Sequence, residues 1–416
     1  MSNYNVVAGC DIGNGYTKAL YKFEDKHFSE GIVIDIPSVS CTYNNVRVMD
    51  VEDIPDNENV FDNLADNRLA LTMDGTIYHK SVFTIGKNAA KRENAAEFDI
   101  NEIETAKYQE NLSQILLVST LAGAALEVDY KRNRKLPAEI NLNVWAAVAL
   151  PIADFIKSNR EYRQSLEGHT FRTVIKNFSE DIVVNVTFVN VSVSAEGDAA
   201  CTAVMEDKTN LLSDVADYLE QDDLYSAEEI EKIRKANGSL DNFIGIDIGD
   251  GTVNIPIFED GQMDMRSESM SIGIGTVFEA ALEDMKNINR QTFSSRKDIA
   301  NYIVNHLDDG EDNRTLVKVL DAIHQAAPEA LLNELTEEFA KIYYKYSRDS
   351  KIVFLFGGGS CLVWEQLLPM LREATKDEMS ESVPIVYMPS NVSRTLNRDG
   401  LFIKAGKRYK NRKKDQ

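Results

Sequence analysis

An internal repeat of a glycine-rich heptapeptide is the sequence feature that most constrains the fold. Gly9-Cys-Asp-Ile-Gly-Asn-Gly15 recurs 236 residues later as Gly245-Ile-Asp-Ile-Gly-Asp-Gly251, and five of the seven positions are identical. Each copy follows an apolar, β-prone segment and precedes another, which predicts the turn of a β-hairpin. Because 416 residues are many for one hydrophobic core, the repeat predicts two similar domains that each carry one such hairpin.

Strands and helices alternate along the rest of the chain, which predicts an α/β fold. Apolar strands are expected at residues 140–150, 243–247, 253–258 and 352–356, and helices at 108–128, 273–286 and 392–410. Pro328 is expected at the first position of a helix. The most apolar stretch, residues 115–126, is too short to span a bilayer and is interpreted as part of a buried core helix.

The chain is strongly acidic, with 45 Lys and Arg against 67 Asp and Glu and a formal net charge of −22. A body of this charge repels phosphate backbones, so broad direct binding to DNA is not expected. The exception is a basic tail, residues 404–416, which holds seven basic residues against one acid. We interpret this tail as a contact for a partner or as a solvated helix end.

The cysteines and histidines favour neither a disulfide framework nor a zinc site. The four cysteines are far apart and form no CxxC pair, and the five histidines show no HxxxH or HExxH spacing. Free thiols are typical of a reducing compartment. With no basic leader before the first strand, we expect a cytoplasmic protein without a membrane partner.

Glycine-rich hairpins can bind phosphate, because glycine allows the backbone N–H groups to approach the oxygens closely. The candidate phosphate-binding residues are Gly13, Asn14, Gly15, Tyr16 and Lys18 in the first hairpin and Gly249, Asp250, Gly251 and Thr252 in the second. Asp11 and Asp247 each end a strand, where a carboxylate can hold the water shell of Mg²⁺. The alternative is a tight β-turn without a ligand. Two copies at equivalent positions favour the phosphate interpretation.

A third glycine turn, Gly357-Gly358-Gly359-Ser360, follows the apolar strand at residues 352–356. It is either a strand-to-helix turn or a surface against which a base and ribose can lie, since absent side chains allow close contact. A P-loop is excluded, because no GxxxxGK[ST] occurs in the chain.

With these motifs in this order, the chain resembles the actin-like ATPase superfamily and, within it, the bacterial ParM/StbA group of plasmid-segregation proteins. Residues 11–18 and 247–256 match the two phosphate motifs of the family. Residues 354–360 match its adenosine motif, and residues 397–402 match the segment that returns the chain to the first domain. Residues 36–38, 85–90 and 148–155 are also similar to that group, so the resemblance covers nearly the whole chain.

The resemblance implies an α/β, actin-like fold, in which a duplicated ribonuclease-H-like core forms two domains with a nucleotide cleft between them. Domain I is expected at residues 1–195 and 391–416, with a small subdomain at about 31–105. Domain II is expected at residues 196–390, with a small subdomain at about 271–335. Asp11 and Asp247 are implied to hold Mg²⁺ through water, and Gly357, Gly358, Gly359 and Ser360 are implied to contact the nucleoside.

The family carries a Glu or Gln that positions the attacking water, and Glu196 fits that place. Asp198 is the competing acid, and Asp247 is the second catalytic candidate. The alternative interpretation is that Glu196 has no catalytic role and is a carboxylate near the start of a helix, where it interacts with the helix dipole. Asn254 stands where relatives often carry Asp or His near the γ-phosphate. The charged helical segment 206–237 is interpreted as an insertion that contacts other subunits in a filament or is simply solvated.

The resemblance implies a filament-forming protein that binds ATP or GTP with Mg²⁺, hydrolyses it and segregates plasmid DNA. Its partners are expected to be further copies of itself and a DNA-binding adaptor protein. The main alternative is a small-molecule kinase of the same superfamily, acting on a sugar or an acid. A chaperone-type ATPase and a scaffold that does not hydrolyse nucleotide are further alternatives.

Overall fold

The computed structural model describes residues 1–24, 31–44, 46, 48, 61–98, 109, 111–206, 210–236, 240–285, 293–346, 350–376 and 383–412. Contacts divide the chain into two compact units. Unit 1 comprises residues 1–150, 154–195 and 398–416, and unit 2 comprises residues 151–153 and 196–397. Each unit has its own hydrophobic core.

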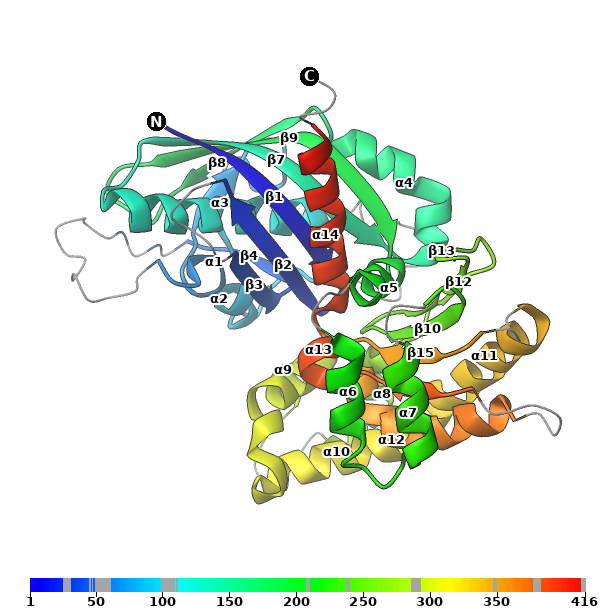
Figure 1. Cartoon of the computed structure of the whole chain (residues 1–416). Helices are drawn as coiled ribbons and strands as arrows, with labels where there is room; N and C mark the ends of the chain where they lie inside the picture. Colours follow the sequence, from blue (N-terminus) through cyan, green and yellow to red (C-terminus); the bar gives the residue numbers. More distant parts are fainter. Residues whose placement is uncertain are drawn as a thin grey trace. The chain divides into compact units, whose positions relative to one another are not determined.

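Unit 1 is built on one large curled sheet (Figure 1). Its nine described strands have the order β3-β2-β1-β7-β9-β8-β5-β6-β4. The strands are β1 (Ser2–Ile12), β2 (Tyr16–Phe23), β3 (Ile32–Pro37), β4 (Ser40–Thr42), β5 (Leu71–Met73), β6 (Phe83–Ile85), β7 (Glu139–Leu150), β8 (Thr170–Ile175) and β9 (Ile182–Ala195). Strands β1, β2 and β3 are antiparallel, whereas β7 runs parallel to β1 and β9 runs parallel to β7.

Unit 2 repeats this pattern of three antiparallel strands followed by two parallel ones. Its described strands are β10 (Phe243–Ile248), β11 (Val253–Ile255), β12 (Ile257–Glu259), β13 (Gln262–Met263), β14 (Glu268–Met270), β15 (Val353–Phe356) and β16 (Ile385–Tyr387). The order β14-β11-β10-β15-β16 corresponds to β3-β2-β1-β7-β9, with the same strand directions. The two copies of the heptapeptide therefore lie at equivalent positions in two units that share one topology.

The strand expected at residues 253–258 is interrupted at Pro256, which separates β11 from β12. Proline has no N–H to donate to a ladder. The Pro256 carbonyl still accepts a hydrogen bond from the Gly245 N–H at 2.9 Å. A Cβ on Gly245 would lie 2.9 Å from Pro256 Cγ, so glycine is needed where the proline crosses β10.

Helices of unit 1 are α1 (Leu64–Asn67), α2 (Gly86–Ala90), α3 (Asn111–Asn133), most of α4 (Ile152–Leu166) and most of α14 (Leu396–Asn411). Helix α3 is the expected core helix, and it ends five residues later than predicted. Of the helices in the described ranges, it alone is long and apolar enough to cross a membrane, and 89% of its most apolar window is buried inside the protein.

Helix α14 packs against the sheet of unit 1 (Figure 1). A Cβ on Gly9 would lie 2.3 Å from the backbone nitrogen of Phe402, so glycine permits this close approach. Farther along, the rings of Tyr409 and Trp145 meet edge to face at 4.9 Å, and Arg412 pairs with Glu24 at 3.2 Å. The last four residues of the basic tail, 413–416, lie outside the described residues.

Helices of unit 2 are α5 (Asp198–Met205), α6 (Leu211–Leu219), α7 (Ala227–Ala236), α8 (Ile274–Met285), α9 (Arg296–His306), α10 (Arg314–Ala327), α11 (Asn333–Tyr346), α12 (Ser360–Ala374) and α13 (Ser390–Ser393), with η3 (Leu307–Asp312) and η4 (Pro328–Leu332). Pro328 begins η4, a π-helical turn between α10 and α11, rather than a separate α-helix. The helix expected at residues 392–410 is divided between α13 and α14.

All four cysteines are free thiols, as the sequence predicted. Cys10, Cys41 and Cys201 are buried, whereas Cys361 is only partly buried. Burial raises the pKa of the Cys10 thiol to about 12, so this thiol is neutral within the core.

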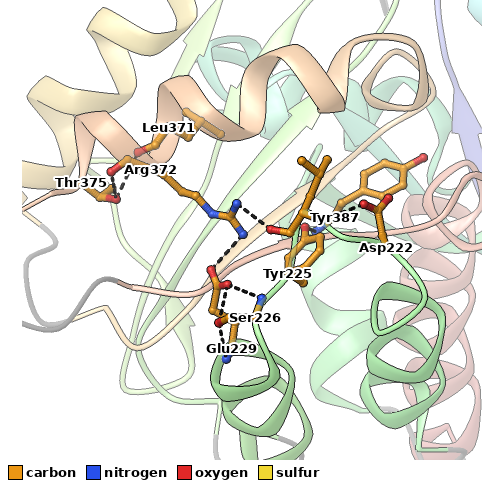
Figure 2. Close-up of polar contacts among 9 residues, drawn as sticks. Asp222, Tyr225, Ser226, Glu229, Leu371, Arg372, Thr375 and Tyr387 are labelled. Carbon is orange, nitrogen blue, oxygen red and sulfur yellow. Dashed lines mark hydrogen bonds and ion pairs between the residues drawn. The ribbon is translucent and has the colours of Figure 1, made fainter.

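The charged segment 206–237 folds as α6 and α7, and its inner side is part of the core of unit 2. Leu212, Leu219, Ile230 and Ile233 are buried there. Arg372 of α12 holds the middle of this segment: it donates to the Leu224 carbonyl at 2.8 Å, in the connection between α6 and α7. It also pairs with Glu229 of α7 at 2.9 Å (Figure 2). Residues 207–209 and 237 lie outside the described residues. The segment is therefore docked, and only its outer side can contact a partner.

Tyr225 also protects the edge of the sheet. Among the described strands, β16 pairs with β15 alone. The backbone N–H of Tyr387 in β16 donates to the Tyr225 hydroxyl at 3.1 Å, which satisfies an edge donor that would otherwise be buried without a partner (Figure 2). Burial raises the pKa of Tyr225, so its hydroxyl stays protonated at neutral pH.

We predict that Tyr225→Phe lowers the free energy of unfolding of unit 2 by about 1–3 kcal/mol, because the Tyr387 N–H loses its acceptor. Tyr218→Phe is the matched control, since Tyr218 is 51% exposed on α6. In a Trp145→Phe background, fluorescence of Trp364, which stacks on Tyr387 at 4.5 Å, reports denaturant unfolding locally. Equal midpoints for the two variants would contradict this role of the hydroxyl.

Candidate functional site

The first glycine hairpin joins β1 to β2 in unit 1 and is supported by Ser38. The Gly13 N–H donates to the Tyr16 carbonyl at 2.9 Å and closes the turn. The Ser38 hydroxyl donates to the Gly13 carbonyl at 2.6 Å, and the Ser38 N–H donates to the Gly15 carbonyl at 2.9 Å. Because the Gly13 amide is already bonded, Asn14 and Gly15 are the better candidates for donors to a phosphate.

Two charged candidates flank this hairpin. Asp11 is the penultimate residue of β1 and is 7% exposed, and Lys18 lies directly opposite it on β2. Lys18 also lies opposite Asp35 of β3. The hairpin therefore combines a nearly buried carboxylate with a cation on the neighbouring strand.

The second hairpin joins β10 to β11 in unit 2 and has the same internal hydrogen bond. The Gly249 N–H donates to the Thr252 carbonyl at 2.9 Å. The carbonyls of Gly249 and Asp250 accept from the first two amides of α8, those of Ile274 and Gly275, at 2.9 and 2.8 Å. These bonds satisfy donors that a helix N-terminus leaves unpaired and fix the hairpin against α8.

Asp250 has a further partner that sequence reasoning did not identify. The Arg296 guanidinium, at the start of α9, donates to Asp250 Oδ2 at 2.9 Å and is largely buried. The Asp250 carboxylate is therefore neutralised from within unit 2. A Ser-x-x-Asp capping box, Ser295 to Asp298, fixes the start of α9 and was visible in the sequence, but nothing there indicated that Arg296 reaches Asp250.

The triple-glycine turn after β15 lies directly against the second hairpin. Gly357 has a φ of +93°, and a Cβ there would lie 2.4 Å from Asp247 Oδ1. The Gly359 N–H donates to the Ile248 carbonyl at 2.9 Å. Ser360 is fully buried and its hydroxyl donates to the Gly357 carbonyl at 2.8 Å, so this side chain supports the turn. Gly358 is the open position, with nothing within 4 Å of an added Cβ.

Asn397 connects the end of β10 to the start of α5. Its Nδ2 donates to Asp247 Oδ2 at 2.8 Å. Its Oδ1 accepts from the backbone N–H groups of Gly197 and Ala200, both at 3.1 Å. All four residues belong to unit 2. The sequence placed Asn397 in the segment that returns the chain to domain I, but did not identify this connection.

Glu196 lies between β9 and α5 and is 9% exposed. The next residue, Gly197, has a φ of +78° and is the N-cap of α5. Glu196 Oε2 accepts a hydrogen bond from Asn254 Nδ2 at 3.1 Å, and Asn254 is paired across the hairpin with Asp247. Unit 2 therefore brings Glu196, Asp247, the second hairpin and the triple-glycine turn into one connected set of contacts.

Magnesium is implied by the resemblance, so we asked whether the carboxylates suit it. No group of three or more His, Cys, Asp or Glu in the described part of the chain could hold a metal ion. Mg²⁺ is typically bound by one or two carboxylates together with waters and substrate phosphates. Asp247, with one oxygen bonded to Asn397 and the other beside Gly357, and Asp11 fit this water-mediated mode in their respective units.

Comparison with solved structures identifies the fold. A Bacillus thuringiensis ParM with AMPPNP matches with a TM-score of 0.59 and 14% identity, over 97% of this chain and 99% of that chain. The chain has an actin-like, ParM-type fold. An archaeal actin homolog matches with a TM-score of 0.58 and 15% identity, over 98% of this chain and 100% of that one.

A third structure, an apo pSK41 ParM, matches with a TM-score of 0.55 and 15% identity over 99% of both chains. No protein-family model and no curated protein matches the sequence. At these identities the likeness is one of fold, and it confirms the α/β, actin-like fold that the resemblance implied.

We predict that Gly357→Ala lowers stability by about 2 kcal/mol or more, because alanine disfavours a positive φ and its Cβ would collide with Asp247. Gly358→Ala is the matched control in the same turn and should unfold at the wild-type midpoint. Thermal and urea unfolding of both variants without nucleotide provide the measurement. Equal losses in both variants would contradict this account, because they would show that the loss does not come from the positive φ of Gly357 and its contact with Asp247.

Proposed function

We propose that this chain is an actin-like nucleoside triphosphatase that polymerises with bound nucleotide and segregates plasmid DNA through a DNA-binding adaptor. The observation that supports it most is the connected set of contacts around Asp247, in which Glu196, Asn397 and Gly357 are held by hydrogen bonds and close packing. ATP is the preferred candidate, because similar folds have been solved with AMPPNP, ATP and ADP.

The two glycine hairpins would bind the phosphates, one from each unit. Asn14, Gly15 and Lys18 are the candidates in unit 1, and Gly251 and Thr252 are candidates in unit 2. Asp250 is better assigned a supporting role through its ion pair with Arg296. Gly358, whose position is open, is the candidate for contact with the nucleoside.

The chemistry requires an oriented water and a neutralised phosphate more than a covalent intermediate. Glu196 would accept a proton from the water as its oxygen bonds to the γ-phosphorus and the bond to the β–γ bridging oxygen breaks. Mg²⁺, when bound, neutralises phosphate charge, and the carboxylates of Asp11 and Asp247 would hold its water shell.

The acidic charge of the chain favours an indirect connection to DNA. With a net charge of −22, the molecule repels DNA, so an adaptor would connect it to the plasmid. Head-to-tail contact between identical subunits generates an open filament when the rotation between them does not close. Nucleotide binding would favour the assembling state, and hydrolysis would weaken it.

We predict that Glu196→Gln slows phosphate release by about 10²- to 10⁴-fold, because a general base is lost, while the affinity for a non-hydrolysable ATP analogue is kept. Asp198→Asn, two residues away, is the matched control and should hydrolyse at close to the wild-type rate. Single-turnover phosphate release with Mg·ATP, and separately with Mg·GTP, is the measurement.

Two results would contradict the proposal in different ways. If Asp198→Asn abolished hydrolysis and Glu196→Gln did not, the assignment of the base would be wrong. If the wild-type chain released no phosphate alone but transferred it to an added sugar or acid, the kinase alternative would replace the triphosphatase.

A further inference from the structure

Both polar atoms of the Asn254 side chain form hydrogen bonds within unit 2. Asn254 lies in β11 and is 1% exposed. Its Oδ1 accepts from the Ile152 backbone N–H at 3.1 Å and from the Ser269 hydroxyl at 2.9 Å. Its Nδ2 donates to Glu196 Oε2 at 3.1 Å. Ile152 and Ser269 both belong to unit 2.

These partners leave one orientation for the amide. A backbone N–H can only donate, so the side of Asn254 that faces Ile152 must be the carbonyl oxygen. The amino group must therefore face Glu196. The backbone of β11 cannot shift easily, because Asn254 is paired with Asp247 of β10 on one side and with Ser269 of β14 on the other.

Glu196 needs such a partner. It lies at the end of a strand, before a glycine with positive φ, and is only 9% exposed. A nearly buried carboxylate without a hydrogen-bond donor carries a large desolvation cost. A donor that contacts Oε2 also restricts rotation of the carboxylate and thereby sets the direction of Oε1.

We propose that Asn254 is a positioning residue that orients the Glu196 carboxylate toward the attacking water. This inference rests on the proposed triphosphatase function. Asn254 acts through Glu196 and not through contact with nucleotide, because it is 1% exposed and both Oδ1 and Nδ2 bond to protein groups. Ser269 supports it in turn, by holding Oδ1 together with Ile152.

Asn254→Asp is the sharpest variant, because it keeps the shape and the acceptor for Ile152 and replaces only the donor toward Glu196. We expect single-turnover phosphate release to fall about 10- to 100-fold, since a misplaced catalytic group costs that much, with the affinity for AMPPNP unchanged. Two nearly buried carboxyl groups in contact disfavour double ionisation, and a proton shared between them would replace the amide donor. The rate is therefore measured as a function of pH, and the loss should be largest at the highest pH. Ser269→Ala should give a smaller loss in the same direction.

The Glu196→Gln background separates positioning from a merely structural role. There, Asn254→Asp should cause no further loss of rate, because the oriented carboxylate is already gone. In the double variant the glutamine at position 196 can donate to the aspartate at position 254, which is the original hydrogen bond with donor and acceptor exchanged. It should therefore unfold at a higher denaturant concentration than Asn254→Asp alone. Equal fold-losses in the two backgrounds, together with additive unfolding midpoints, would overturn the inference.

Different results would overturn the proposed triphosphatase function and the proposed positioning role of Asn254. A wild-type chain that hydrolyses no nucleotide overturns the triphosphatase and the positioning role with it, even if the unfolding midpoints are coupled. A wild-type chain that hydrolyses ATP, with Asn254→Asp equally active, overturns the positioning role alone.

Discussion

The hydrogen bond between Asn397 and Asp247, at 2.8 Å, is the contact on which the arrangement of unit 2 depends. Asp247 is 4% exposed, and a carboxylate buried to that degree requires a donor. The same asparagine accepts from the N–H groups of Gly197, the N-cap of α5, and of Ala200 in its first turn, so the end of β10 and the start of α5 are held by one side chain. On its other side Asp247 packs against Gly357, which admits no Cβ. The hydrogen-bonded pair of Asn397 and Asp247 thus joins the strand end, the helix start and the glycine turn.

The hairpins were predictable from the sequence because their signals are local. A glycine turn between two β-prone segments needs no distant partner, and the repeat of residues 9–15 at residues 245–251 indicated two units. The contacts that complete the site were not predictable in this way. Asn397 lies 150 residues from Asp247, and Arg296 lies 46 residues from Asp250. Such pairs depend on tertiary packing, which the spacing of residues in one sequence does not show.

Differences in the secondary structure have equally physical causes. Pro256 breaks a strand expected to be continuous, and Pro328 begins a π-helical turn between two helices. The charged segment 206–237 is interpreted from the sequence as an insertion that contacts other subunits or is solvated. Its inner side lies in the core, where Arg372 holds it. Hydrophobic residues at helical spacing among charged ones show that a helix is amphipathic, but not which surface it covers.

The central claim is that nucleotide binding drives self-assembly of this chain and hydrolysis reverses it. Right-angle light scattering recorded together with phosphate release, after addition of Mg·ATP to the full-length chain, tests it most directly. The account predicts that scattering rises only above a critical protein concentration and decays as phosphate appears. Flat scattering at protein concentrations where bound nucleotide is demonstrated by calorimetry would contradict it.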